Sequence, residues 1–157
     1  MRNRRHRAPI TLCLLLLTAA VNGRARAADL TVVCFGDSTT ASRSTVKQVY
    51  ADRLPALLAE YGIEAEVINS GVGSSHSGRK TDHPRGPEKH ALDRFQEAVR
   101  DHNPDVVIIQ FGWNDSWVDE GGEGAASRIP VEDYTRNIAF MTETLKEDGA
   151  RVILMTP

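Results

Sequence analysis

The sequence contains few cysteines and no pattern of metal-ligating residues. Of its two cysteines, Cys13 lies close to the N-terminus and Cys34 lies inside an apolar run. Cys34 is therefore interpreted as a small core residue rather than as part of a disulfide. The sequence has no HExxH motif, no cysteine pair and no ladder of Asp and Asn residues. These absences argue against a metal site, and we expect no metal and no cofactor.

The chain also lacks an apolar run long enough to cross a bilayer, which takes roughly 20 residues. Its longest apolar stretch, residues 8–21, follows four arginines and precedes the small residues around 25–27. This pattern is typical of a secretory signal peptide, predicted here over residues 1–27, with a retained membrane anchor as the alternative. We therefore expect a secreted or periplasmic protein without a stable membrane span after signal cleavage. The Arg4-Arg5 pair would permit a twin-arginine export route.

Basic side chains become scarce once the predicted signal peptide is removed. Six of the 19 Lys and Arg residues, and none of the 21 Asp and Glu residues, fall within residues 1–27, so the mature chain would carry a net charge of −8. Nucleic-acid phosphates are bound by clustered Lys and Arg. We therefore expect no nucleic-acid partner.

No internal repeat and no linker interrupts the remaining sequence, which predicts one domain over residues 28–157. Short runs rich in Val, Ile and Leu alternate with longer stretches of helical periodicity, as in strands buried on both faces and the helices that connect them. The expected strands are 30–35, 65–68, 106–110 and 152–155, and the expected helices are 46–61, 88–101 and 130–149.

This alternation predicts an α/β fold, specifically a flavodoxin-like three-layer sandwich around a parallel sheet with strand order 2-1-3-4. Ligands bind such sheets beyond the carboxyl ends of the strands, at the point where the strand order reverses. The chain ends directly after the fourth strand, where a further helix would ordinarily follow. We therefore expect the domain to be partial and the fold to be C-terminally incomplete.

Three polar motifs follow the first three predicted strands. They are Gly36-Asp37-Ser38, the loop 69–74 with sequence Asn-Ser-Gly-Val-Gly-Ser, and Gly112-Trp113-Asn114-Asp115. Because the carboxyl ends of parallel strands share one edge, Ser38 and Asn114 are expected to face each other. A serine on such a turn can act as a nucleophile if a base takes its proton. It could also simply cap the following helix.

The three motifs, in this order, resemble those of the SGNH or GDSL-type family of esterases, lipases and acylhydrolases, and the resemblance runs from residue 30 to residue 157. It implies hydrolysis of carboxylic esters through an acyl-serine intermediate. Ser38 would be the nucleophile, and the Asn114 side-chain amide and the Ser38 backbone N–H would stabilise the oxyanion. A turn-forming role is the alternative for Asn114, and Asp37 is interpreted as a residue that shapes its turn.

The sequence departs from the family pattern at two places. The oxyanion glycine of the second motif is replaced by Ser74, whose backbone N–H would have to serve instead, with Gly73 as the local alternative. The family's C-terminal Asp-x-x-His block, which supplies the catalytic base, is absent. The histidines after residue 70 are predicted to be exposed, and His76 is not assigned as the base, although its loop lies at the expected edge.

The expected substrate is a small-molecule or carbohydrate ester, with the acetyl ester of a sugar as the leading interpretation. Trp113 and Trp117 could form a wall against such a substrate or pack in the core or at its rim. The loop 74–88 is interpreted as a polar surface loop. Two alternatives belong to other classes, namely a non-catalytic carbohydrate- or ligand-binding remnant of the same fold, and a flavodoxin-like module that binds phosphate after the first strand.

Overall fold

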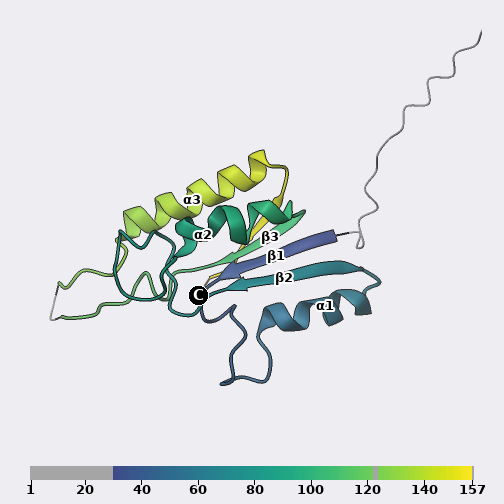
Figure 1. Ribbon diagram of the computed structural model, residues 1–157, viewed down its shortest axis with the longest axis horizontal. Helices are drawn as coiled ribbons and strands as arrows, with labels where there is room; N and C mark the ends of the chain where they lie inside the picture. The colour runs from purple at the N-terminus through teal and green to yellow at the C-terminus, as the bar shows by residue number, and fades with distance from the viewer. Residues whose placement is uncertain (1–29, 122–123, 157) are drawn as a thin grey trace, which may run out of the picture.

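The computed structural model describes residues 30–121 and 124–156. The predicted signal peptide, residues 1–27, lies outside these described residues. Within them, four parallel strands form one sheet in the order β2-β1-β3-β4, as the sequence predicts (Figure 1). The strands are β1 Leu30–Gly36, β2 Ala65–Gly71, β3 Val106–Gln110 and β4 Arg151–Leu154.

Three α-helices in the described part of the chain cover this sheet, with α2 and α3 on one face and α1 on the other (Figure 1). Their bounds are α1 Tyr50–Glu60, α2 Ala91–Ala98 and α3 Val131–Glu147, and a short 3₁₀ helix, η1 Arg100–His102, follows α2. The fold is therefore the predicted three-layer α/β sandwich.

Each helix is shorter than the sequence predicts, and for two of these differences the structure shows the cause. Helix α1 begins at Tyr50 rather than near residue 46, because Val49 is buried in an extended conformation that cannot continue a helix backward. The second predicted helix divides at Val99, whose backbone (φ −134°, ψ −64°) departs from α geometry. Val99 is fully buried, so packing of its side chain fixes this break.

The apolar core has one layer on each face of the sheet. Phe35, Phe95 and Phe111 pack with Met141 and Leu145 beneath α2 and α3, and the rings of Phe35 and Phe111 meet edge to face at 5.2 Å between centroids. The core thus joins both helices to the centre of the sheet.

The layer beneath α1 contains Cys34, which is fully buried as predicted. Burial raises the pKa of its thiol to about 11, so the thiol stays protonated and unreactive at neutral pH.

Burial on both faces holds for the central strands β1 and β3 but was a wrong prediction for the edge strands. Strand β2 is mostly half-buried, and in β4 the side chains of Ile153 and Leu154 are 50% and 55% exposed. An edge strand has a neighbour on one flank only, and less of its surface lies beneath the helices.

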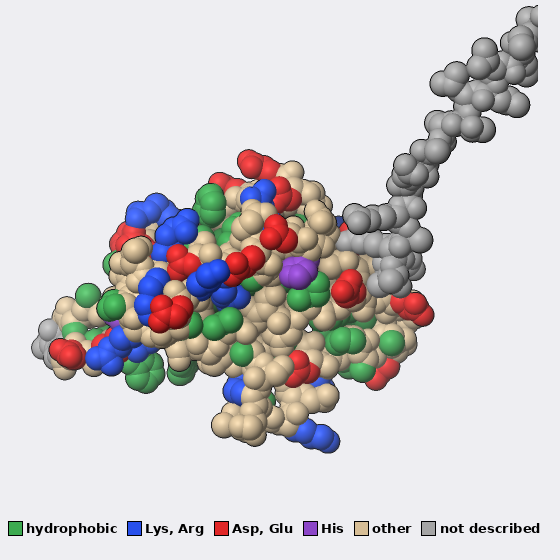
Figure 2. All heavy atoms as spheres, in the orientation of Figure 1, with side chains coloured by type: hydrophobic (Ala, Val, Ile, Leu, Met, Phe, Trp, Pro, Cys, Tyr) green, Lys and Arg blue, Asp and Glu red, His purple; other side chains and the backbone are tan. Residues whose placement is uncertain are grey.

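No helix in residues 30–121 and 124–156 is long and apolar enough to span a membrane. The same residues contain no group of three or more His, Cys, Asp or Glu side chains placed to hold a metal ion. On the face shown in Figure 2, acidic and basic side chains lie interspersed rather than gathered in one basic patch.

Candidate active site

The first motif forms a tight turn directly beyond β1. The buried Asp37 accepts hydrogen bonds at Oδ1 from the backbone N–H of Thr39 (2.8 Å) and from its hydroxyl (2.7 Å). The Asp37 carbonyl oxygen accepts from the N–H groups of Thr40 and Ala41. Asp37 therefore shapes the turn, as predicted, and half-buried Ser38 lies at its start.

Glycine is required at the entrance to this turn. A β-carbon on Gly36 would lie 2.1 Å from the Thr40 hydroxyl and 2.7 Å from the Gln110 carbonyl oxygen. Ser38 does not cap the next helix, because α1 begins only at Tyr50 and its N-cap residue is Val49. The capping alternative for Ser38 is therefore wrong.

The second motif is pressed against the first. Asn69 accepts a hydrogen bond from Gly71 N–H (3.0 Å) and donates from Nδ2 to the carbonyl oxygen of Thr40 (2.9 Å). A β-carbon on Gly71 would lie only 2.2 Å from the backbone nitrogen of Ala41. The missing side chain at Gly71 thus lets the two turns touch, while Asn69 ties them together.

Ser74 has the left-handed backbone conformation, with φ of 60°, that glycine usually supplies. The serine therefore occupies a glycine-like position, which explains how it can stand where the SGNH pattern has glycine. Within the described residues, the backbone N–H groups of Ser38 and Ser74 donate to no acceptor. Neither group is committed to another acceptor among these residues.

Asn114, from the third motif, connects all three turns. Its Nδ2 donates to the carbonyl oxygen of Ser75 (3.0 Å) and makes a longer contact with Asp37 Oδ2 (3.4 Å). Asn114 is 8% exposed. The fold thus brings Asn114 into contact with Asp37, which precedes Ser38, and with Ser75, which follows Ser74.

Asp115 is a second buried polar residue of the third motif. Its Oδ1 accepts a hydrogen bond from Ser77 N–H (2.8 Å), and its side chain is almost fully buried. Desolvation raises the pKa of Asp115, and the hydrogen bonds from Ser77 offset part of this shift. Sequence reasoning assigned Asp115 no role, although its place beside Asn114 was the available signal.

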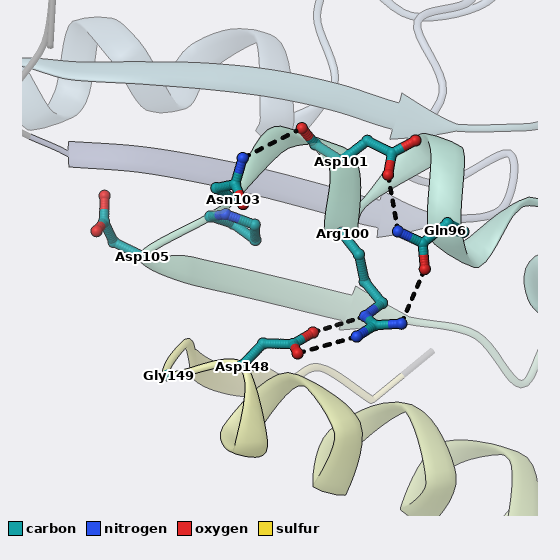
Figure 3. Close-up of a pocket in the computed structure, with 8 residues that line it drawn as sticks. Gln96, Arg100, Asp101, Asn103, Asp105, Asp148 and Gly149 are labelled. Atoms are coloured by element: carbon teal, nitrogen blue, oxygen red, sulfur yellow. Dashed lines mark hydrogen bonds and ion pairs between the residues drawn. The ribbon is translucent and has the colours of Figure 1, made fainter. Parts of the chain in front are cut away.

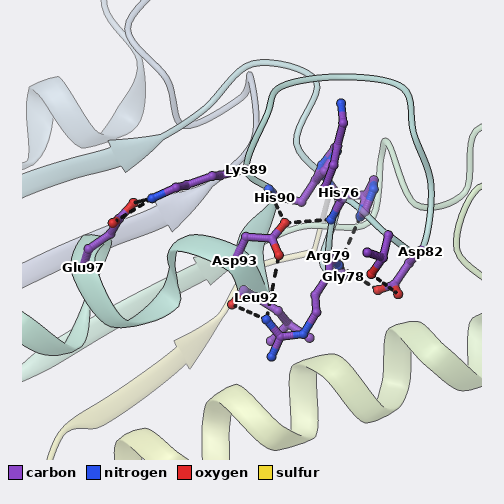
Figure 4. Close-up of polar contacts among 11 residues, drawn as sticks. His76, Gly78, Arg79, Asp82, Lys89, His90, Leu92, Asp93 and Glu97 are labelled. Atoms are coloured by element: carbon purple, nitrogen blue, oxygen red, sulfur yellow. Dashed lines mark hydrogen bonds and ion pairs between the residues drawn. The ribbon is translucent and has the colours of Figure 1, made fainter.

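The histidine predictions were partly wrong. His102 is exposed as expected and His83 is half-buried, but His76 and His90 are fully buried. Their rings stack at 3.5 Å between centroids, with 12° between their planes (Figure 4). The backbone N–H of His76 donates a hydrogen bond to His90 Nδ1 (3.1 Å). Imidazole nitrogen accepts backbone hydrogen bonds, which is how these rings are accommodated inside the loop 74–88.

No described histidine is hydrogen bonded to Ser38. Burial, as the first cause, lowers the pKa of both His76 and His90, in the case of His90 to about 4. Both rings are therefore neutral near pH 7. Residues 75–78 of the loop 74–88, which include His76, are buried, and this corrects the interpretation of that part as a plain surface loop.

Two hollows lie beside the third motif. One of about 350 Å³ is bounded by Gly112, Asp115, Ser116, Ser127, Ile129, Val131 and Tyr134. The other, a shallow depression of about 400 Å³, is bounded by Trp113, Ser116, Trp117 and Val118. Trp113 is 58% exposed and Trp117 is 49% exposed, so the structure places both indoles at the rim and not in the core.

A hollow of about 650 Å³ lies far from these motifs, at the opposite edge of the sheet (Figure 3). It is bounded by residues near the start of β3, such as Asp105, and near the end of α3, such as Asp148. Arg100 and Asp148 form a two-pronged ion pair there, with nitrogen to oxygen distances of 2.6 and 2.9 Å. These contacts join α3 to η1, and none of the predicted site residues lies there.

Comparison with known proteins places the three motifs in a family context. The model of the GDSL-like Lipase/Acylhydrolase family matches residues 34–157. An arylesterase of Vibrio mimicus is 27% identical over 147 residues, which cover 93% of this chain and 63% of that protein.

Two solved structures have a similar fold. A lipase/acylhydrolase from Enterococcus faecalis is 27% identical with a TM-score of 0.60, over 82% of this chain and 57% of that one. An acetyl xylan esterase from Geobacillus stearothermophilus is 21% identical with a TM-score of 0.63, over 83% of this chain and 61% of that one. The chain therefore spans about three fifths of the length of these relatives.

Proposed function

Because the chain belongs to the GDSL-like lipase/acylhydrolase family, we propose that it hydrolyses carboxylic esters through Ser38. The observation that carries this proposal is the position of Asn114, whose Nδ2 reaches both Asp37 and Ser75. These contacts gather the nucleophile turn and the second loop around one amide donor. Such a cluster of donors suits a carbonyl oxygen that becomes negative during acyl transfer.

In the proposed reaction, Ser38 Oγ forms a bond to the ester carbonyl carbon while its proton passes to a base. The carbonyl oxygen becomes an oxyanion that accepts hydrogen bonds from Asn114 Nδ2 and from the backbone N–H groups of Ser38 and Ser74. The carbon–oxygen bond to the alcohol then breaks, and the alcohol leaves with a proton. Water next attacks the acyl-serine, releasing the carboxylic acid and restoring the Ser38 hydroxyl.

The two hydrogens of Asn114 Nδ2 already have acceptors, and these differ in strength. The contact with Ser75 O is 3.0 Å long, whereas the contact with Asp37 Oδ2 is 3.4 Å long and correspondingly weak. The oxyanion would replace Asp37 as acceptor, because this exchange sacrifices the weaker bond. Asn114 would stay held by Ser75 throughout.

For the substrate, we propose a small ester and, more narrowly, an acetyl ester of a carbohydrate. The acetyl xylan esterase is similar in fold, and the exposed indoles of Trp113 and Trp117 border a shallow depression at the third motif. Flat aromatic faces can stack on the apolar faces of sugar rings. The arylesterase relative makes an aryl ester the second candidate substrate.

A non-catalytic ligand-binding protein is the second candidate function, because no described histidine contacts Ser38. Phosphate binding after β1 is not supported, since the turn Gly36-Asp37-Ser38 lacks the form of a glycine-rich phosphate loop. For localisation we propose export to the periplasm or the exterior, on the basis of residues 1–27, which lie outside the described structure.

Hydrolysis of p-nitrophenyl acetate and labelling by a fluorophosphonate test the proposal. The wild type should hydrolyse the ester and take up the label at Ser38, and Ser38→Ala should lose both. Ser44→Ala is a matched control, because Ser44 lies exposed in the following loop. Equal rates and labelling in the wild type and Ser38→Ala would exclude Ser38 as nucleophile, and an unlabelled, inactive wild type would favour the binding function.

A further inference from the structure

The peptide group between Ser75 and His76 is held at both ends by buried side chains. Its carbonyl oxygen accepts from Asn114 Nδ2 (3.0 Å), and its N–H donates to His90 Nδ1 (3.1 Å). Because a peptide group is planar and rigid, the two contacts together set the orientation of the plane. The N–H of Ser74, one of the proposed oxyanion donors, belongs to the peptide group two positions earlier in the chain.

The backbone determines the protonation state of both imidazoles. His90 Nδ1 accepts from His76 N–H, and His76 Nδ1 accepts from Gly78 N–H (3.1 Å). A backbone N–H can only donate, so neither Nδ1 can carry a proton and each neutral ring has its proton on Nε2. His76 Nε2 faces the carbonyl oxygen of His83 at 3.4 Å.

We propose that His90 is a positioning residue, whose neutral ring holds the Ser75–His76 peptide in the orientation that keeps the Asn114 amide and the Ser74 N–H in place for the oxyanion. This inference rests on the proposed function of Asn114 and Ser74. When His90 becomes protonated, Nδ1 turns from an acceptor into a donor and faces the His76 N–H. The hydrogen bond is lost, and the peptide is released from one side.

The groups around His90 favour its neutral form. Burial is the main cause of its lowered pKa, and stacked His76 and the nearby Lys80 act in the same direction. Asp93 and the backbone of Arg85 oppose them in part. The Asp93 carboxylate also accepts hydrogen bonds from the backbone N–H groups of His90 (3.0 Å) and Lys80 (2.7 Å). These bonds fix the backbone of His90 at the start of α2 (Figure 4).

His76 faces a separate set of charged groups. Burial is the largest cause and lowers its pKa, whereas the hydrogen bond with the His83 backbone raises it. Of the nearby charges, Asp115 and Asp82 raise the pKa of His76 and His83 lowers it. The two rings are stacked too closely for both to be charged without strong repulsion. Protonation of either ring therefore discourages protonation of the other, and the hydrogen bond from His76 N–H to His90 Nδ1 is the one that fails when His90 takes the proton.

Other contacts confine the expected change to one peptide. The carbonyl oxygens of His76 and Gly78 accept from the N–H groups of Ala91 (3.1 Å) and Leu92 (3.0 Å), the first residues of α2. These bonds do not involve the His90 ring. Protonation should therefore release the Ser75–His76 peptide while the loop stays attached to the helix.

Backbone amide exchange followed by NMR tests this inference without any ester hydrolysis. In the wild type, protection of the His76 amide, corrected for intrinsic exchange, should fall about tenfold as His90 titrates from near neutral pH to acid, the size expected for one lost hydrogen bond. The Asn114 side-chain amide resonances should shift with the same midpoint. The amides of Ala91 and Leu92 should keep their protection.

Two variants and one control sharpen the test. His90→Asn places a non-titrating carbonyl oxygen near the former Nδ1 and should keep the His76 amide protected in acid, whereas His90→Phe keeps the stacked ring but should lose protection at every pH. His102→Asn, at an exposed position, should behave as the wild type. If His90→Phe does not fold, the wild-type titration decides alone.

The inference would be overturned if His76 protection did not change while His90 titrates, or if it fell only together with that of Ala91 and Leu92. Failure of the proposed function would look different. Ser38 would then remain unlabelled and inactive, whatever the exchange of the His76 amide showed.

Discussion

Arg94 on α2 donates a hydrogen bond from Nη2 to the carbonyl oxygen of Gly36 at the end of β1, over 2.9 Å. Its Nη1 donates to the carbonyl oxygen of Ser70 near the end of β2 (2.7 Å), and its guanidinium lies 4.4 Å from the centre of the Phe35 ring. A single buried cation therefore joins the two strand ends from which Ser38 and Ser74 emerge. Burial lowers the pKa of Arg94 to about 10, so the group remains charged at neutral pH.

Arg94→Met should destabilise the protein by about 2 kcal/mol, because it leaves two buried carbonyl oxygens without their donor while keeping most of the apolar volume. The free energy of unfolding from urea denaturation measures this change. Arg100→Met is the matched control, since Arg100 pairs with Asp148 at the partly exposed opposite edge. The control should have the smaller effect, and the reverse order would contradict the role given to Arg94.

Gly71→Ala should destabilise the protein by about 3 kcal/mol, because the new β-carbon would collide with the backbone of Ala41 and push the first two turns apart. Gly73→Ala, two residues later, meets no atom within 4 Å and should change stability by less than about 1 kcal/mol. The melting temperatures of the two variants, measured by thermal unfolding, provide the comparison. Equal melting temperatures would mean that the turns are not in contact.

Asn114→Ala should lower kcat for p-nitrophenyl acetate by about 100-fold and change KM little, because the amide is proposed to act on the charge of the transition state. Steady-state kinetics beside the wild type measures both constants. A similar fold in the variant, checked by circular dichroism, is the control. A raised KM with unchanged kcat would indicate substrate binding instead of oxyanion stabilisation.

Acidification should destabilise the protein through His90. The unfolded chain protonates a histidine near its ordinary pKa of 6.5, whereas folded His90 does so only near 4, so the unfolded state binds more protons between these values. The contribution of His90 to the free energy of unfolding is therefore fully present above pH 6.5, and it decreases as the pH falls toward 4.

Asp115, whose pKa is raised, acts in the opposite direction over the acid range, so His90 must be isolated by difference. Unfolding free energies of the wild type and His90→Asn, measured at several pH values, give that difference. The variant should lose less stability on acidification. Parallel curves for the two proteins would show that His90 contributes nothing to the pH dependence.

The sequence alone determined the arrangement of the elements and the places of the three motifs. Apolar runs in β1 and β3 are buried wherever parallel strands lie beneath helices, and turn residues follow each strand regardless of distant neighbours. For this reason the strand order, the burial of Cys34 and the positions of Ser38 and Asn114 at strand ends were predictable. The local role of Asp37 followed in the same way, because it depends on residues two to four positions away.

Only the tertiary structure decided which of these residues touch. Asn114 is separated along the chain by 77 residues from Asp37 and by 39 from Ser75, yet it contacts both. The burial of His76 and His90 was equally hidden, because a polar ring becomes a core residue only when backbone N–H groups of a folded loop point at its nitrogens. The weaker cover of β2 and β4 depends on their edge positions in the sheet. Long-range contacts of this kind are set by how the elements pack, which residue type and spacing do not specify.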